Sequence, residues 1–166
     1  MTVRPLVFYP DKRLREVARP VESFDADLEQ LAQDVLDTMR AAPGIGMTAC
    51  HIGVLQRVVV IELSVEAGAQ IYINPEIVWS SPELTRHMEG SVSMPGVSDE
   101  VERPSRVQVR YRDLAGAQKV VEADGLVGVC LQHEIDQLDG VFWIQRLSKL
   151  RRDRLVKRFE KLCRLK

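Results

Sequence analysis

The segment Leu131–Gly140, LQHEIDQLDG, decides how the rest of this chain is interpreted. It has the frame of the H-E-x-x-H zinc helix, in which two histidines one helical turn apart hold a metal and the glutamate acts on a bound water. His133 and Glu134 fill the first two positions, but Gln137 stands where the second histidine belongs. Alone, this HExxQ pattern is a weak signal, because a His-Glu pair on a helix is more often structural than catalytic.

The spacing around this segment predicts a helix from about residue 126 to Gly140. One side of it is apolar and must be packed against the core: Val127, Leu131, Ile135 and Leu138. The other side is polar and consists of Cys130, His133, Glu134 and Gln137. A functional site is one environment that accepts such a polar face.

The remaining pattern predicts helices near both ends and strands between them. Helices are expected at 25–40 and from about 149 to the end, and strands at 57–63, 71–79, 106–112 and 118–122. Pro75 favours an edge or bent position for the strand at 71–79. Helices at both ends of a run of short strands indicate an α+β fold, with one domain over 1–166.

Composition places the chain among soluble globular proteins, with 166 residues, 45% hydrophobic and 28% charged. We find no segment typical of a membrane span and no secretory pattern at the start. Three cysteines without a disulfide pattern favour a reducing compartment. We therefore expect a cytoplasmic protein that does not enter a membrane.

The net charge of −1 conceals an asymmetry along the chain. Residues 146–166 contain ten Lys and Arg against two Asp and Glu, so a basic arm follows an acidic body. Such an arm is typical of contacts with nucleic acid or another polyanion. The alternative is an ordinary solvated helix face.

Two other segments give the HExxQ pattern more weight. They are GIGMTACH at 44–51 and EGSVS at 89–93. In this order, the three segments resemble the signature motifs of the peptide deformylase family, G-x-G-L-A-A-x-Q, E-G-C-L-S and Q-H-E-x-D-H. The likeness covers roughly the whole chain, and includes Tyr9-Pro-Asp, Asn74-Pro75, Arg103-Pro104 and Leu138-Asp-Gly140.

The resemblance implies a bacterial protein of translation with mostly antiparallel sheets around a central motif helix. Members of the family remove the formyl group from the N-formylmethionine of nascent chains. Their cysteine and two histidines hold iron or zinc, and the motif glutamate handles the proton of a bound water. The first motif pairs with the peptide and helps to stabilise the oxyanion. The basic C-terminal helix docks on the ribosome, which gives 149–166 a possible partner.

This chain departs from the family at the metal. The three ligand positions fall on Ser91, His133 and Gln137, of which only His133 is a good ligand, while Glu134 keeps the catalytic position. The substrate and oxyanion positions fall on Gly44, Gly46, His51 and Val92. A serine hydroxyl and an amide bring no charge to a divalent ion. The resemblance therefore predicts no standard iron or zinc cofactor and a pseudoenzyme in place of a standard deformylase.

The sequence leaves several hypotheses open about activity. The favoured one is a monomeric deformylase-like protein that binds peptide N-termini in its cleft or contacts the ribosome. One alternative is an active hydrolase, which has two forms. The first removes the N-formyl or a related acyl group at a metal site rebuilt from His51, His133 and Glu134 or assisted by Ser91. The second is metal-free, with Ser91 as the nucleophile and His133 or His51 as its base. In that second form, only Glu134 is evident as an acid to orient the histidine. A third hypothesis is a structural protein that makes no use of the cleft.

Three expectations concern the arrangement of side chains at and around the replaced positions. Ser91 and Gln137 are expected to hydrogen-bond to each other or to water in place of the metal. Cys50 and His51 are expected to point in opposite directions, as neighbours on an extended segment do. Glu89 and Arg103 are expected to form an ion pair that holds the second motif.

Overall fold

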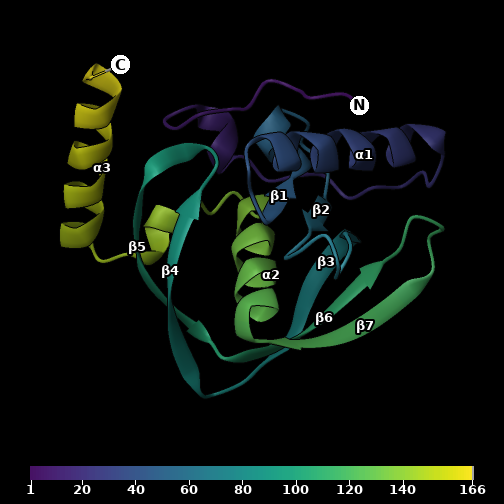
Figure 1. The fold of residues 1–166 in the computed structure, drawn as a ribbon. Helices are drawn as coiled ribbons and strands as arrows, with labels where there is room; N and C mark the ends of the chain where they lie inside the picture. Colours follow the sequence, from purple (N-terminus) through teal and green to yellow (C-terminus); the bar gives the residue numbers. More distant parts are fainter. Residues whose placement is uncertain (166) are drawn as a thin grey trace.

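The computed structural model describes residues 1–165 and shows an α+β fold with two antiparallel sheets, as expected (Figure 1). The strands are β1 (Gly46–Thr48), β2 (Val58–Ile61), β3 (Gln70–Ser80), β4 (Leu84–Ser91), β5 (Met94–Pro104), β6 (Arg106–Arg112) and β7 (Gln118–Asp124). The helices are α1 (Ala26–Ala41), α2 (Gly125–Leu138) and α3 (Lys149–Arg164), with short 3-10 turns at Lys12–Arg15, Ala49–Ile52 and Trp143–Arg146. Within residues 1–165, no helix is both long and apolar enough to cross a bilayer.

The larger sheet has the strand order β1-β2-β3-β6-β7, so the strand at 70–80 lies in its middle. The expected edge position is therefore wrong, although the expected bend is present, because the register with β6 shifts between Ile73 and Glu76. This irregularity accommodates Pro75, which has no N–H to donate to the ladder. Asn74 adopts a positive φ of 51° there, and its side chain hydrogen-bonds both backbone groups of Val21.

The motif helix α2 lies at the centre of the fold, between the larger sheet and the β4–β5 hairpin (Figure 1). Three members of its predicted apolar side, Leu131, Ile135 and Leu138, are buried against residues of β2 and β6. The helix follows β7 directly at Gly125 and stops before Gly140, whose φ of 75° suits glycine. Packing of the apolar side thus directs the polar side of α2 toward the hairpin.

Helix α1 positions the first motif. Asp25 caps its start by accepting a hydrogen bond from the backbone N–H of Leu28. Its apolar side packs against β1 and β2, in a cluster that includes Met39, Met47 and Val58. The chain leaves the helix at Ala41, and the N–H of residue 44 returns to the carbonyl of Met39 at 2.8 Å. This contact fixes where residues 44–46 approach α2.

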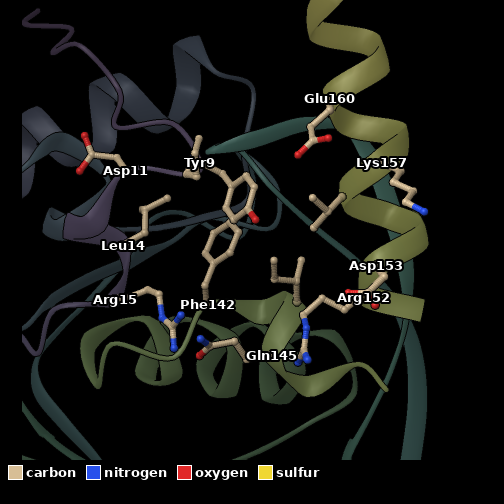
Figure 2. A pocket seen from close by; sticks show the side chains of 13 residues that line it. Tyr9, Asp11, Leu14, Arg15, Phe142, Gln145, Arg152, Asp153, Lys157 and Glu160 are labelled. Atoms are coloured by element: carbon tan, nitrogen blue, oxygen red, sulfur yellow. The ribbon is translucent and has the colours of Figure 1, made fainter. Parts of the chain in front are cut away.

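Helix α3 is held by the smaller sheet and by the N-terminal segment. Leu155 and Phe159 are buried in a cluster with β5, and the Tyr9 ring packs against the rings of Phe142 and Phe159 with centroids 5.8 and 5.9 Å apart. The predicted C-terminal helix is confirmed as far as Arg164, and Lys166 lies outside the described residues. Figure 2 shows the groove that remains between α3 and the N-terminal segment, with Asp11, Arg15 and Lys157 among its charged lining residues. The residues that line this groove include no histidine and no cysteine.

Candidate functional site

A cleft of about 420 Å³ lies beside α2, where the first motif, the end of β4 and the polar side of the helix meet. The residues predicted from sequence that line it are Gly44, Gly46, His51, Ser91, Val92, His133 and Glu134. These residues are up to 90 positions apart in the sequence. The fold therefore brings most of the predicted site together in one cavity.

Gln137 is the predicted residue that does not line this cleft. Its buried amide donates a hydrogen bond to the carbonyl of Leu14 at 2.7 Å, while the hydroxyl of Ser91 accepts one from the N–H of Ser93. The expected bond between Ser91 and Gln137 is therefore wrong. The reason is tertiary, because the N-terminal segment crosses the end of α2 and presents a buried carbonyl that the amide satisfies.

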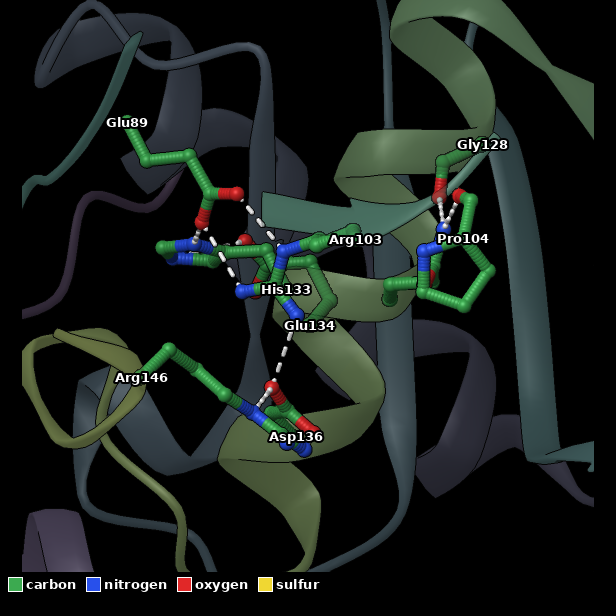
Figure 3. Close-up of polar contacts among 9 residues, drawn as sticks. Glu89, Arg103, Pro104, Gly128, His133, Glu134, Asp136 and Arg146 are labelled. Carbon is green, nitrogen blue, oxygen red and sulfur yellow. Dashed lines mark hydrogen bonds and ion pairs between the residues drawn. The ribbon is translucent and has the colours of Figure 1, made fainter. Parts of the chain in front are cut away.

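A buried ion network supports the cleft from behind (Figure 3). The guanidinium of Arg103 donates to both carboxylate oxygens of Glu89 at 2.6 and 2.9 Å, and to Asp136 at 2.8 Å. Arg146 then binds Asp136 through two further bonds of 2.9 and 2.7 Å. Arg103 is only 4% exposed, so these contacts replace its hydration. The expected Glu89–Arg103 pair is confirmed, and it ties β4 and β5 to α2.

His133 is oriented by Glu89. The Nδ1 atom of the ring lies 2.8 Å from Oε1 of Glu89, which fixes the ring with Nε2 on the opposite side, 3.8 Å from Oε1 of Glu134. The expectation that only Glu134 could orient this histidine is therefore wrong. Burial alone would lower the pKa of His133, but the bond to Glu89 and the charges of both glutamates raise it overall.

The carboxylate of Glu134 is buried in the cleft without full pairing. Its Oε2 atom has no hydrogen-bond partner among the described residues and lies 4.0 Å from Nδ1 of His51. Burial raises the pKa of Glu134 to about 7. A Cβ atom on Gly46 would lie 3.3 Å from Oε1, so glycine leaves the room that this side chain occupies.

His51 lies in the 3-10 turn Ala49–Ile52, which differs from the extended segment expected. Its Nδ1 atom accepts the N–H of Thr48 at 3.0 Å, so the ring proton of the neutral form is on Nε2. Burial and the nearby His133 lower the pKa of His51 to about 3. Cys50 packs in the core on the other side, so only His51 faces the cleft, as expected.

The cleft contains no assembled nucleophile among the described residues. No hydrogen bond joins Ser91 to His51 or His133 in this part of the chain, and the Ser91 hydroxyl is engaged with Ser93. Cys130 lines the cleft but also belongs to the core, and burial raises the pKa of its thiol to about 12. A thiol that stays protonated is a poor nucleophile.

The side chains at the three ligand positions do not fit the iron or zinc that the resemblance implies. Ser91 offers a neutral hydroxyl, and the amide of Gln137 is turned onto a carbonyl, so His133 stands alone as a good ligand. Across residues 1–165, no three His, Cys, Asp or Glu side chains are grouped so that they could hold a metal ion.

The mouth of the cleft has features that suit a peptide. Strand β1 pairs only with β2 in the larger sheet, and the carbonyl of Ile45 accepts the N–H of Glu62 from that side. The polar backbone groups of Gly46 therefore point to the free edge, because they alternate along an antiparallel strand. Ile45, Met88 and Leu126 form an exposed apolar rim, which the motifs did not reveal because rim positions are set by the fold.

Comparison with known proteins gives one consistent match. Residues 3–153 match the model of the family described as "Polypeptide deformylase". A "Peptide deformylase-like" protein of Brucella melitensis biotype 1 is 66% identical, with 99% of this chain and all of that protein covered. Rhizobium meliloti strain 1021 has two relatives, one "Peptide deformylase-like" at 57% identity and one "Peptide deformylase" at 46%, covering 95% and 96% of those proteins and 99% of this chain.

The fold leads to the same group of proteins. A crystal structure of a peptide deformylase from Legionella pneumophila superposes with a TM-score of 0.93 at 38% identity, with 99% of this chain and 97% of that chain covered. The central helix between two antiparallel sheets is therefore an architecture that a solved structure shares.

The buried network predicts a large loss of stability in Arg103→Met. We expect the free energy of unfolding to fall by about 3–5 kcal/mol in denaturant titrations, because Glu89 and Asp136 would remain as buried carboxylates without their cation. Arg110→Met is the matched control, since the exposed pair with Glu76 contributes at most about 1 kcal/mol. Equal losses in the two variants would contradict this assignment.

Proposed function

We propose, because this chain belongs to the peptide deformylase family, that it binds peptide N-termini in the cleft beside α2 without deformylating them by the metal route. The proposal rests on which features of a deformylase site the cleft retains and which it has lost. Its peptide-facing strand edge and buried glutamate are present, whereas the side chain of Gln137 is turned onto the carbonyl of Leu14. The strand edge and the glutamate therefore support peptide binding, whereas the side chains at the ligand positions do not support metal binding.

The free edge of β1 supports peptide binding. An extended peptide can add to such an edge through backbone hydrogen bonds, while its side chains enter neighbouring pockets. Gly44 and Gly46 present bare backbone beside this edge, and a Cβ on either would come within 3.3 Å of the cleft residues Val92 or Glu134. The apolar rim formed by Ile45, Met88 and Leu126 suits an apolar first side chain.

The donor set argues against standard deformylation. When bound in this family, a metal polarises the formyl carbonyl and activates a water. Here Ser91 and Gln137 each hydrogen-bond to backbone, which leaves Glu134 without two of the ligands that would hold such an ion near it. Rhizobium meliloti strain 1021 has both a deformylase and a deformylase-like relative, which fits a division of roles between the two types.

Elemental analysis and a formate-release assay test the absence of standard activity. The protein purified without chelator is expected to hold far less than one equivalent of iron or zinc, and to release no formate from formyl-Met-Ala-Ser above the level of Glu134→Gln. The triple variant Ser91→Cys, Gln137→His, His51→Gln should bind about one equivalent, because thiolate and imidazole ligands are restored. Near-stoichiometric metal with Glu134-dependent formate release in the wild type would support the alternative, an active metallohydrolase with a rebuilt site.

Calorimetric titration with Met-Ala-Ser and formyl-Met-Ala-Ser tests peptide binding. Met88→Ser is expected to weaken binding by up to about tenfold, because burial of the apolar first side chain against the rim is lost. Leu84→Ser is the matched control, since Leu84 is an exposed apolar residue of the same strand that does not line the cleft. Absence of binding for both peptides, or an equal effect of both variants, would refute the proposal.

We also propose a contact between α3 and ribosomal RNA. The apolar side of the helix is packed on β5, which directs a row of cations outward: Arg151, Arg154, Lys157, Arg158, Lys161 and Arg164 are exposed. Phosphate groups are the natural partners of such a row, and their binding weakens with salt. Removing the whole helix would uncover the buried Leu155 and Phe159, so charge reversal is the cleaner test.

Co-sedimentation with ribosomes at low salt measures this contact. Lys157→Glu with Lys161→Glu is expected to reduce the bound fraction strongly, because two attractive contacts with phosphate become repulsive. Arg110→Glu with Lys119→Glu reverses two exposed charges on β6 and β7 and should have little effect. Equal sedimentation of all three proteins would argue for a solvated helix face.

A further inference from the structure

We infer that the cleft selects an unblocked N-terminus, the α-ammonium group of a peptide with an apolar first residue, over the same peptide with a formyl cap. This rests on the proposed function and specifies its ligand class. The chosen ligand is the product of the reaction that deformylases catalyse, so this chain would act after that step. The inference rests on what surrounds Glu134.

Glu134, unlike Glu89 and Asp136, forms no ion pair with Arg103 or Arg146 of the buried network. Arg103 is bound to Glu89 and Asp136, and Arg146 is bound to Asp136, so neither guanidinium reaches Glu134. The Nε2 atom of His133 lies 3.8 Å from Oε1, beyond hydrogen-bond distance. The Oε2 atom is buried and has no partner among residues 1–165.

His51 does not supply the missing donor through its nearer nitrogen. Its Nδ1 atom lies 4.0 Å from Oε2 of Glu134 and already accepts the N–H of Thr48. Glu134 therefore lines the cleft, and its Oε2 atom is a buried acceptor without a hydrogen-bond donor among residues 1–165. A buried polar atom without a partner destabilises the free protein, and a ligand with donors would relieve that cost.

The free edge of β1 lies beside the same carboxyl group, on the side of its Oε1 atom. The polar groups of Gly46 face the free edge of β1, and a Cβ at that residue would lie 3.3 Å from Oε1 of Glu134. A peptide whose first residue pairs with Gly46 thus brings its α-nitrogen to the carboxylate, while its first side chain meets the apolar rim.

A free N-terminus and a formylated one differ in charge and in the number of hydrogen-bond donors. An ammonium group offers three donors and a positive charge, both complementary to a buried carboxylate. A formyl cap removes the charge, leaves one donor and adds a carbonyl, which is an acceptor. In a cleft that does not provide the metal ligands, that carbonyl has no Lewis acid to meet, so the capped peptide is disfavoured.

Calorimetric titration of the intact protein with three ligands tests this inference. They are Met-Ala-Ser, formyl-Met-Ala-Ser, and 4-(methylthio)butanoyl-Ala-Ser, which keeps the first side chain but has no amino group. We expect Met-Ala-Ser to bind at least about tenfold more tightly than either of the others. In Glu134→Gln, this preference should fall to less than about threefold, and the affinity for the desamino ligand should change little.

The outcomes separate the two proposals. Equal or tighter binding of the formyl peptide would overturn this inference and leave peptide binding intact, as would a preference for the free amine that survives in Glu134→Gln. Absence of binding for all three ligands would overturn both. The comparison of the amino and desamino ligands on the wild-type protein needs no variant, so it decides the question even if Glu134→Gln does not fold.

Discussion

The buried guanidinium of Arg103 is the constraint on which the rest of the site depends. It comes from β5, binds Glu89 of β4 and reaches Asp136 of α2, so one side chain joins the smaller sheet to the central helix. Charges buried this deeply are stable only when every one of them is paired. The same network orients His133, because Glu89 binds both Arg103 and the Nδ1 atom of the ring.

The polar side chains that replace residues of the deformylase motifs form hydrogen bonds within the protein. Gln137 donates to the carbonyl of Leu14, Ser91 accepts the N–H of Ser93, and His51 accepts the N–H of Thr48. These three side chains are therefore each hydrogen-bonded to a backbone group, as buried polar groups require. Glu134 differs from them, since one of its oxygens remains without a partner in the described chain. The proposed preference for a free N-terminus rests on that contrast.

Local patterns predicted all three helices and the strands β2, β3, β6 and β7, but gave no bounds for β1, β4 and β5. The helix at 26–41 with its Asp25 cap and the hairpin of β6 and β7 follow from periodicity and turn residues that act within a few positions. Pro75 predicted either an edge or a bend for the strand at 71–79, and the structure has the bend, because a register shift accommodates the proline inside the sheet. Sequence spacing also put Gln137 on the polar side of α2 without revealing that the N-terminal segment passes there.

The sequence by itself determined the α+β class and the motif helix, because helix periodicity is a local property, and its resemblance to the deformylase motifs identified the three ligand positions and their chemical types. Only the tertiary structure decided which atoms those side chains meet. Glu89 as the partner of His133 is 44 positions away, and Leu14 as the partner of Gln137 is 123 positions away. Contacts over such separations depend on how sheets and helices pack around one core, which no short stretch of sequence encodes.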